Sequence, residues 1–312
     1  MISLRYHVVT IVAVFLALAV GLLAGSAFVE PELVDQLRQQ TDNLRGDVGE
    51  LDRQLTETRT ELAAVSAFAD GSDAFVDAVA PSLTEGRLAG TPVVVVTQTG
   101  VEDEVLPEVQ RALSNAGAEI VTTVSATDQI VSEDPTTQEE LALILGEPTI
   151  PPEELPLRTA EALADRLSPT GSSVIGPDIL AELLSAGFLE PIGAGPSETT
   201  LAEIGAPGQV VIVLSGGRGE EPVLPPEAFA VPLVGSLADR DVPVGAGESL
   251  LSNYDFVSII RSDGVDGAVT VDDLDRSMGG AALVLGLEQL LATGQGGAYG
   301  VKDGADPLPP LP

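Results

Sequence analysis

The stretch from Val8 to Val29 constrains this chain most, because it runs for 22 residues without a charged side chain. A helix of that length covers roughly 33 Å, close to the thickness of a bilayer's hydrocarbon core. Arg5 and His7 precede it and Glu30 follows it. The single Arg before the segment favours a cytoplasmic amino terminus. The pattern therefore predicts that residues 1–30 form a membrane anchor and that the chain crosses the membrane once. The carboxyl-terminal part of the chain would then lie outside the cytoplasm.

Two other interpretations of this segment stay open. Gly25, Ser26 and Ala27 are small residues of the kind found at a signal-peptidase site, so the segment could be a cleaved signal peptide. Its length favours a retained anchor, because the hydrophobic region of a signal peptide usually has about 7–15 residues. A soluble core helix would carry a polar face, and here only Thr10, Ser26 and glycines interrupt the apolar residues.

Charge and composition exclude several classes of function. The 312 residues include 48 Asp and Glu against 14 Lys and Arg, for a formal net charge of −34, and Lys302 is the only lysine. Nucleic acids and anionic lipid surfaces would be repelled, because Lys and Arg drive binding to them. Cysteine is absent, which rules out disulfides, thiol nucleophiles and thiolate metal sites.

A heptad pattern follows the anchor and predicts a coiled-coil stalk over residues 31–80. Pro31 suits the first turn of the new helix. Eight of ten core positions are apolar when the a and d positions are assigned to Val34, Leu37, Thr41, Leu44, Val48, Leu51, Leu55, Thr58, Leu62 and Val65. Leucine at three d positions favours a parallel homodimer. An amphipathic helix folded back onto its own domain is the alternative.

The next part of the chain predicts an α/β domain over residues 81–300, with a mostly parallel sheet. We expect Pro81 to stop the stalk helix. Pro92 to Thr97 contains four consecutive valines, which is typical of a strand buried on both faces. A helix over Val105 to Ala116 and a strand over Ile120 to Val124 complete a β-α-β unit.

The remaining elements continue the alternation of helices and strands. Residues 127 to 170 hold two predicted helices, Gln138 to Leu145 and Leu157 to Leu167, and we interpret them as an insertion. Later elements are expected at these ranges: a helix at Pro177 to Ala186, strands at Phe188 to Ile192 and Gln209 to Leu214, short apolar elements at Val231 to Leu237, Val242 to Val244 and Phe256 to Ile260, and a helix at Met278 to Leu291. The Pro-rich tail, residues 301–312, is predicted to be disordered.

Three local patterns are candidates for chemistry. Ser215-Gly216-Gly217-Arg218-Gly219 follows a buried strand, but its spacing fits neither dinucleotide nor P-loop motifs, so a turn is favoured over a phosphate site. The acids between Asp266 and Asp275 lack the spacing of a calcium loop, and we expect them to cap the following helix. Glu102-Asp103-Glu104 precedes another helix and is interpreted in the same way.

Catalysis has little support, and no catalytic residue, cofactor or metal ligand can be assigned. The only histidine, His7, lies at the membrane boundary, where an interfacial role is favoured over a ligand role, and no G-x-S-x-G motif is present. A pair of carboxylates could serve a hydrolase, but 48 acids allow many pairs. A non-enzymatic protein is therefore expected.

Two stretches carry a resemblance to a known family. The opening MISLRYHVVTIVAVFLALAVGLLAGS and the closing VTVDDLDRSMGGAALVLGLEQLL with GQGGAYG, together with the stalk and the valine strand, resemble the actinobacterial copper transport protein family, the MctB-like proteins. The resemblance implies an envelope location and a role in copper homeostasis, described for the family as copper efflux across the outer membrane. It also implies a link to related proteins that act in cell separation with a partner protein.

Two hypotheses of function follow: an envelope protein of copper homeostasis, and a dimeric scaffold that binds another envelope protein. The residues themselves limit direct copper chemistry. Cu(I) selects sulfur and imidazole ligands, and beyond residue 30 the chain offers only Met278. We therefore expect no tight Cu(I) site, and weak copper binding through carboxylates at most.

Overall fold

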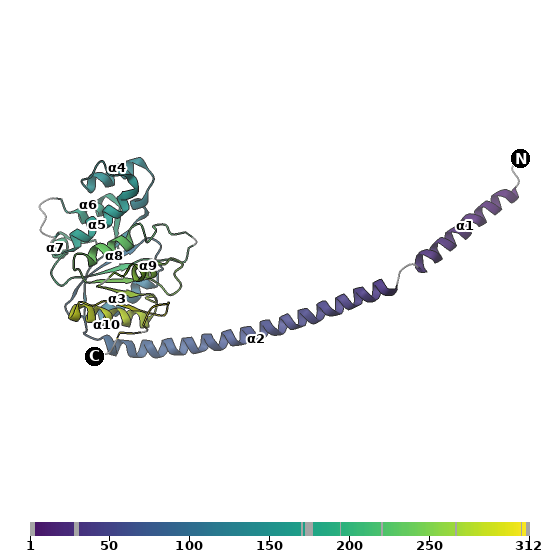
Figure 1. Ribbon diagram of the computed structural model, residues 1–312, viewed down its shortest axis with the longest axis horizontal. Coiled ribbons are helices and arrows are strands. Elements are labelled where there is room, and N and C mark those ends of the chain that lie inside the picture. Colours follow the sequence, from purple (N-terminus) through teal and green to yellow (C-terminus); the bar gives the residue numbers. More distant parts are fainter. Residues whose placement is uncertain are drawn as a thin grey trace. The chain divides into compact units, whose positions relative to one another are not determined.

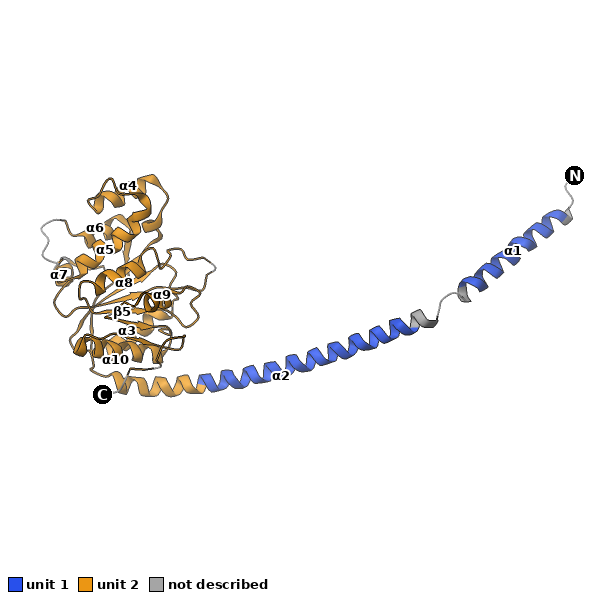
Figure 2. Cartoon of the chain, in the orientation of Figure 1, with its two compact units in different colours: residues 1–70 blue, residues 71–312 orange. Residues whose placement is uncertain are grey.

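The computed structural model describes residues 4–27, 31–169, 171, 177–193, 195–219, 221–265, 267–306 and 308–309. The chain divides into two compact units, Met1–Asp70 and Gly71–Pro312, which are coloured separately in Figure 2.

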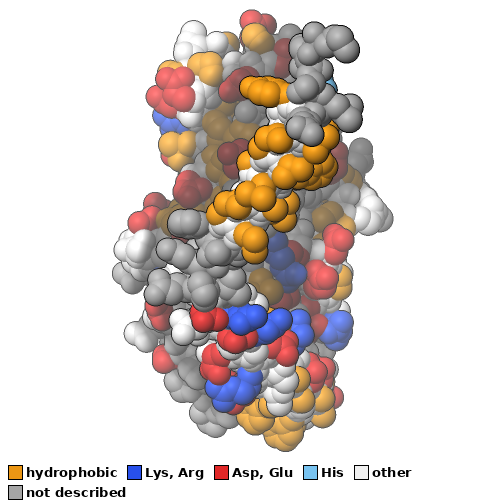
Figure 3. All heavy atoms as spheres, turned by 90° about the vertical axis from the view of Figure 1, so that its right-hand side faces the viewer, with side chains coloured by type: hydrophobic (Ala, Val, Ile, Leu, Met, Phe, Trp, Pro, Cys, Tyr) orange, Lys and Arg blue, Asp and Glu red, His pale blue; other side chains and the backbone are white. Residues whose placement is uncertain are grey.

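The first unit begins with α1, Leu4–Ala27, an apolar helix. Its stretch from Tyr6 to Gly25 has a mean hydropathy of 2.7, and its length and composition are those of a membrane-spanning helix. The exposed hydrophobic side chains of α1 form the continuous orange run in Figure 3. The expected end of the anchor, residues 28–30, lies outside the described residues.

The second helix, α2, runs from Pro31 to Thr84, so the segment that was predicted to form a stalk is helical and its helix begins at Pro31. Every described side chain from residue 35 to residue 70 is exposed. The exposed set includes seven apolar heptad positions: Leu37, Leu44, Val48, Leu51, Leu55, Leu62 and Val65. Charged residues three positions apart form ion pairs along the helix, such as Arg53 with Glu50 at 2.6 Å. Exposed pairs of this kind contribute little to stability because solvent screens them, so the apolar stripe is the main feature of the stalk.

Pro81 does not stop α2, contrary to the sequence prediction, because the helix continues to Thr84. A proline removes a single backbone N–H donor from a helix. In α2 a side chain from another helix provides additional hydrogen bonds to the final turn. Asn115 Nδ2 donates to the Pro81 carbonyl and to Thr84 Oγ1, both at 2.8 Å. These bonds tie the end of α2 to the end of a domain helix, and residues 71–84 accordingly group with the second unit.

The second unit contains a seven-stranded sheet in the order β3-β2-β1-β4-β5-β6-β7. All neighbouring pairs are parallel except β2 with β3, which is antiparallel at one edge. This architecture confirms the predicted α/β class. The strands are β1 Pro92–Gln98, β2 Glu119–Ala126, β3 Leu189–Pro191, β4 Val210–Leu214, β5 Val244–Gly247, β6 Ala268–Val271 and β7 Gly297–Tyr299.

Helices cover both faces of the sheet, as Figure 1 shows. Successive side chains of a strand point to opposite faces of the sheet, and both faces of β1 are apolar. Val93 and Val95 lie in one buried cluster, whereas Val94 and Val96 lie in the other. The first cluster includes α3 and α10, and the second includes α4, α5, α6, α8 and α9. The bounds are α3 Val105–Asn115, η1 Asp128–Val131, α4 Pro135–Ile144, η2 Pro152–Glu154, α5 Leu155–Leu167, α6 Ile179–Ala186, α7 Glu198–Glu203, α8 Ala230–Ala238, α9 Phe256–Asp263 and α10 Ser277–Thr293.

Helix α10 is buried on nearly all sides from Gly279 to Leu287. Glycine makes this close packing feasible: a Cβ atom on Gly286 would lie 2.8 Å from Val269 Cγ1 and 2.9 Å from Tyr299 Cε2. The segment from Met278 to Leu291, which was predicted to be a helix, is therefore apolar on nearly all sides because the sheet and the neighbouring elements enclose it.

Two further predictions need correction. The segment interpreted as an insertion supplies α5, whose buried face belongs to the same core cluster as β4 and α8. The disorder expected for residues 301–312 does not hold for the described part of the tail. Asp306 pairs with Tyr299, and its N–H donates to the Ala298 carbonyl at 2.9 Å. Residues 307 and 310–312 lie outside the described residues.

Candidate functional site

Parallel strands place the carboxyl ends of β1, β4, β5, β6 and β7 at one edge of the sheet, where α/β proteins usually bind ligands. The loops that follow these strands hold most of the buried polar atoms without a hydrogen-bond partner among the described residues. The set comprises Gln98 Oε1, both carboxylate oxygens of Glu102, Glu248 Oε2, Ser249 Oγ, both carboxylate oxygens of Asp273 and Arg276 Nε, and only Thr122 Oγ1 lies elsewhere. We call this group of residues the carboxyl-edge cluster.

The strand order reverses between β1 and β4. The loops that follow these two strands contact each other at this position. A Cβ atom on Gly217 would lie 2.8 Å from the Gly100 carbonyl oxygen, so the two loops touch. Asn253 donates its backbone N–H to the Gly217 carbonyl at 2.8 Å. Glu102 pairs with Arg218 Nε at 3.4 Å. The structure thus joins two segments that the sequence singled out separately.

The Ser215–Gly219 segment is a loop, as predicted, and Gly216 adopts a positive φ of 109° within it. No helix starts in the described residues directly after it, since α8 begins only at Ala230. The helix amino terminus that usually completes a phosphate site is therefore missing from this loop.

Glu248 lies at the end of β5 and is fully buried. The Lys302 ammonium reaches it from the tail, with Nζ 2.8 Å from Oε1. Burial raises the pKa of Glu248, and the Lys302 charge offsets part of that rise. The only lysine of the chain therefore neutralises a buried acid 54 positions away in the sequence.

Asp272 follows β6 and is also fully buried. Arg261 Nη1 donates to its Oδ2 at 2.7 Å, and the backbone N–H groups of Val301 and Lys302 donate to its Oδ1 at 2.7 and 3.1 Å. Arg261 also donates to Thr270 Oγ1 at 3.0 Å and to the Tyr299 carbonyl at 2.8 Å. One guanidinium thus holds β6, β7 and α9 together.

Asp273 differs from its neighbour, because its carboxylate has no hydrogen-bond partner among the described residues although it is fully buried. Desolvation raises the pKa of Asp273 to about 7, and the nearby charges of Asp272 and Asp275 act in the same direction. Arg276 and Arg261 oppose the rise without cancelling it. A carboxyl group in this state holds a proton or a cation close to neutral pH.

The side chains of these acids form no capping bond with the helices that they precede, so the predicted side-chain capping is wrong. Helix α10 has Arg276 as its N-cap, with no side-chain capping bond and no acid in its first turn. Helix α3 has Glu104 as its N-cap, again with no side-chain bond. In the 272–276 loop the carboxylates of Asp272 and Asp275 instead accept bonds from other segments, as Asp275 Oδ1 does from the Leu250 N–H at 2.7 Å. Asp266 lies outside the described residues.

Met278 lies in the first turn of α10, beside a cavity of about 330 Å³. Charged residues from α2, from α3 and from the loop before α10 line this cavity: Asp73, Asp77, Glu108, Arg111, Asp275 and Arg276. Several of them are already paired, Arg276 with Asp73 and Arg111 with Glu108. In the part of the chain that the structure describes, no group of three or more Asp, Glu or His residues is arranged to hold a metal ion.

Sequence reasoning identified Asp272, Asp273 and Glu102 but not Glu248 or Arg261. The single lysine was the sequence feature that could have pointed to Glu248, because the only Lys in a chain with 48 acids is expected to pair with one of them. The arrangement as a whole binds the loops of the carboxyl edge to one another through buried ion pairs, and it leaves acceptor oxygens that suit cationic or hydrogen-bond-donating groups. His7 lies in α1, outside this cluster, with an exposed side chain.

Known proteins match the chain along nearly its whole length. The family model described as copper transport outer membrane protein, MctB, matches residues 1–310. The copper transporters MctB of Mycobacterium tuberculosis and Mycobacterium bovis are each 27% identical over 329 residues, which cover 98% of both chains. The copper transporter MctB of Mycobacterium leprae is 27% identical over 331 residues, with the same coverage. These relatives are named as transporters and not as enzymes. The chain therefore belongs to the MctB family of copper transport outer membrane proteins.

Proposed function

We propose that this protein is a single-span envelope protein that acts in copper homeostasis or efflux, with its α/β domain outside the cytoplasm. The observation that carries the proposal is the family match over residues 1–310, which includes both the apolar helix and the domain. A deletion strain should grow more poorly than its parent in raised copper, and the full chain should restore growth. Equal copper tolerance of the two strains would contradict the proposal.

The location of the domain can be tested separately. Protease added to intact spheroplasts should digest residues beyond 31 and leave α1 in the membrane pellet. Sequencing the amino terminus of the mature protein decides between anchor and signal peptide, because a start near Ala27 would mean that the segment is removed.

The domain itself is proposed to lack a tight Cu(I) site. Met278 is the only sulfur ligand beyond residue 30, and the lining residues of its cavity offer oxygen and guanidinium groups. Cu(I) prefers sulfur and imidazole, whereas carboxylates hold Cu(II) with poor discrimination against other divalent ions. Titration of the purified protein with Cu(I) against a competing chelator should show no stoichiometric submicromolar binding. A tight site that survives Met278→Leu would show that other ligands exist.

A second candidate function is a dimeric scaffold that binds another envelope protein. The exposed apolar stripe on α2 favours it, because an isolated helix with Gly46 and Gly49 in its interior is marginal in water. A parallel second copy would cover Leu44 and Leu51 in a coiled coil. Sedimentation should show a dimer that Leu44→Asp with Leu51→Asp disrupts, whereas a monomer at every accessible concentration would remove the stalk dimer. Cell-separation defects in the deletion strain, without copper sensitivity, would favour this function over the first.

A further inference from the structure

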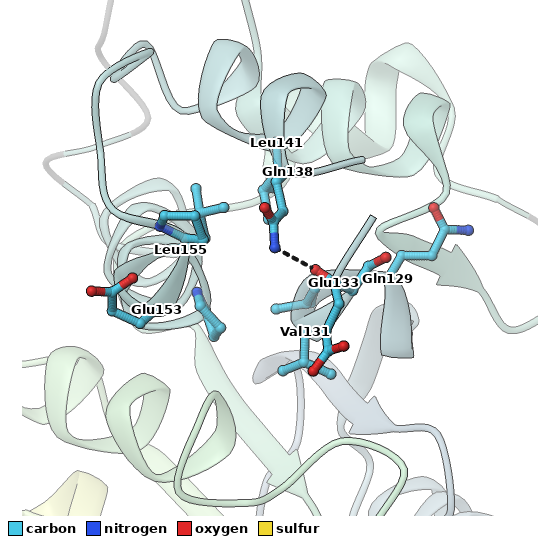
Figure 4. Close-up of a pocket in the computed structure, with 11 residues that line it drawn as sticks. Gln129, Val131, Glu133, Gln138, Leu141, Glu153 and Leu155 are labelled. Atoms are coloured by element: carbon cyan, nitrogen blue, oxygen red, sulfur yellow. Dashed lines mark hydrogen bonds between the residues drawn. The ribbon is translucent and has the colours of Figure 1, made fainter. Parts of the chain in front are cut away.

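A second concave surface lies just beyond the end of β2, among η1, α4 and the corner where η2 meets α5 (Figure 4). Its cavity has a volume of about 360 Å³, at the lower end of the range that ligand pockets occupy. Much of its lining is apolar: Ile130, Val131, Leu141, Pro152, Leu155 and Pro156. We call it the η1–α4 pocket.

The walls of the η1–α4 pocket are fixed by the fold. Ile130, Leu141 and Leu155 are each 1–2% exposed and belong to the hydrophobic core. Gln138 Nε2 donates to the Ser132 carbonyl at 3.0 Å, which is the dashed line in Figure 4, and this bond joins α4 to the η1 loop. The pocket is therefore formed before any ligand arrives, and binding would not require these elements to be ordered.

The charge around the pocket has one sign. No Lys, Arg or His occurs between Arg111 and Arg158, whereas residues 128–154 contain eight acids. Glu133 and Glu153 stand on opposite sides of the cavity in Figure 4, and both are exposed. Neither forms an ion pair within the described part of the chain. The basic residue nearest to Glu153 in sequence, Arg158, pairs with Glu161 at 2.8 Å. Two carboxylates therefore remain available to a cation at the pocket rim.

From this geometry we infer that the η1–α4 pocket binds an extended segment of another envelope protein, with an apolar side chain in the cavity and flanking Lys or Arg side chains on Glu133 and Glu153. The inference rests on the proposed scaffold function and names its surface. Charge complementarity selects this partner, since anionic lipids and a second copy of a chain with net charge −34 would be repelled. Proline-bordered, apolar walls suit a side chain of moderate size.

The test uses the full chain in detergent and three labelled peptides. The first has a central photoreactive leucine flanked by arginines, the second replaces the arginines with glutamates, and the third carries a photoreactive group on a polar residue in place of the leucine. Binding is measured by fluorescence anisotropy, and cross-linked residues are mapped by mass spectrometry. Glu133→Gln with Glu153→Gln tests the rim. Glu139→Gln with Glu140→Gln removes the same charge from α4 residues that do not line the pocket.

The first peptide should bind saturably and cross-link within residues 129–156. The rim variant should bind this peptide with an affinity about tenfold lower than the wild type, and the α4 variant with an affinity less than about threefold lower. Equal weakening by both variants, equal binding of the glutamate peptide, cross-links elsewhere, or no binding at all would overturn the assignment. The rim variant is also expressed in the deletion strain. If the peptide test fails while this variant restores copper tolerance, the surface is wrong and the copper function stands.

Discussion

The same residue, glycine, occupies helix interiors in the stalk and in the domain, with opposite consequences. Gly46 and Gly49 of α2 have no atom within 4 Å of an added Cβ. Gly286 of α10 would place that Cβ within 3 Å of two side chains. The stalk helix therefore loses stability through its glycines, whereas the domain needs glycine to bring α10 against β6 and β7.

The acids of the two regions show the same contrast. In the stalk, Glu50 is exposed and pairs with Arg53 one turn away. In the domain, Glu248, Asp272 and Asp273 are fully buried, and the first two meet cations supplied by distant segments. Charges in the stalk act locally and weakly, while charges in the domain hold separate elements together.

Arg261→Met should destabilise the domain by about 3–5 kcal/mol, because it leaves the buried Asp272 carboxylate without its cation. Urea unfolding followed by circular dichroism measures the change. The matched control is Arg53→Met in the stalk, which should change stability far less, because solvent screens the exposed ion pair. Equal effects of the two substitutions would erase the distinction between buried and local pairs.

Asp273→Asn should change the pH dependence of stability. The pKa of Asp273 is raised from 3.8 to about 7 in the folded protein, so its contribution to stability is present below pH 3.8 and is lost as the pH rises to 7. The Asn variant should match the wild type near pH 4 and exceed it above pH 7. The upper limit of the gain is on the order of 4 kcal/mol, and we expect roughly half. A difference between the two proteins that does not vary from pH 4 to pH 8 would contradict the assignment.

Gly286→Ala should destabilise the domain by about 1–2 kcal/mol, because the gain in helix propensity is smaller than the cost of displacing Val269 and the Tyr299 ring. Thermal unfolding measures the shift. Gly235→Ala in α8 is the control, since no atom lies within 4 Å of its added Cβ, and it should be neutral or stabilising. A stabilised Gly286→Ala protein would mean that α10 packs less closely than described.

Gly46→Ala and Gly49→Ala should each stabilise α2 by about 1 kcal/mol, because open space surrounds both positions and alanine favours the helix. The helical signal at 222 nm, followed during heating of the full chain, should persist to higher temperature in the double variant. A loss of helicity would show that these glycines make contacts that a single chain does not contain.

Patterns that depend on neighbours in sequence were predictable. The heptads of the stalk repeat with the period of a helix, whereas the uncharged run before residue 30 and the valines of β1 are continuous apolar stretches of the length of one element. In each case local chemistry determines the structure. The Val105–Asn115 helix between two strands followed for the same reason. Elements of only three or four residues, such as β7 at Gly297–Tyr299, were missed because so short a stretch has no measurable period.

Tertiary structure alone decided the carboxyl-edge cluster. An acid before a helix has the same sequence signature whether it caps that helix or turns inward, and in this chain Asp272 turns toward Arg261 and the tail backbone. Glu248 and Lys302 lie far apart in sequence and meet only because parallel strands bring their carboxyl ends to one edge. The sequence by itself thus determined the apolar first helix, the long second helix and the class of fold, because these follow from the local pattern of apolar residues. Which acids are buried, and which cation neutralises each one, depended on long-range packing, since the desolvation of a charge is set by whatever the folded chain places around it.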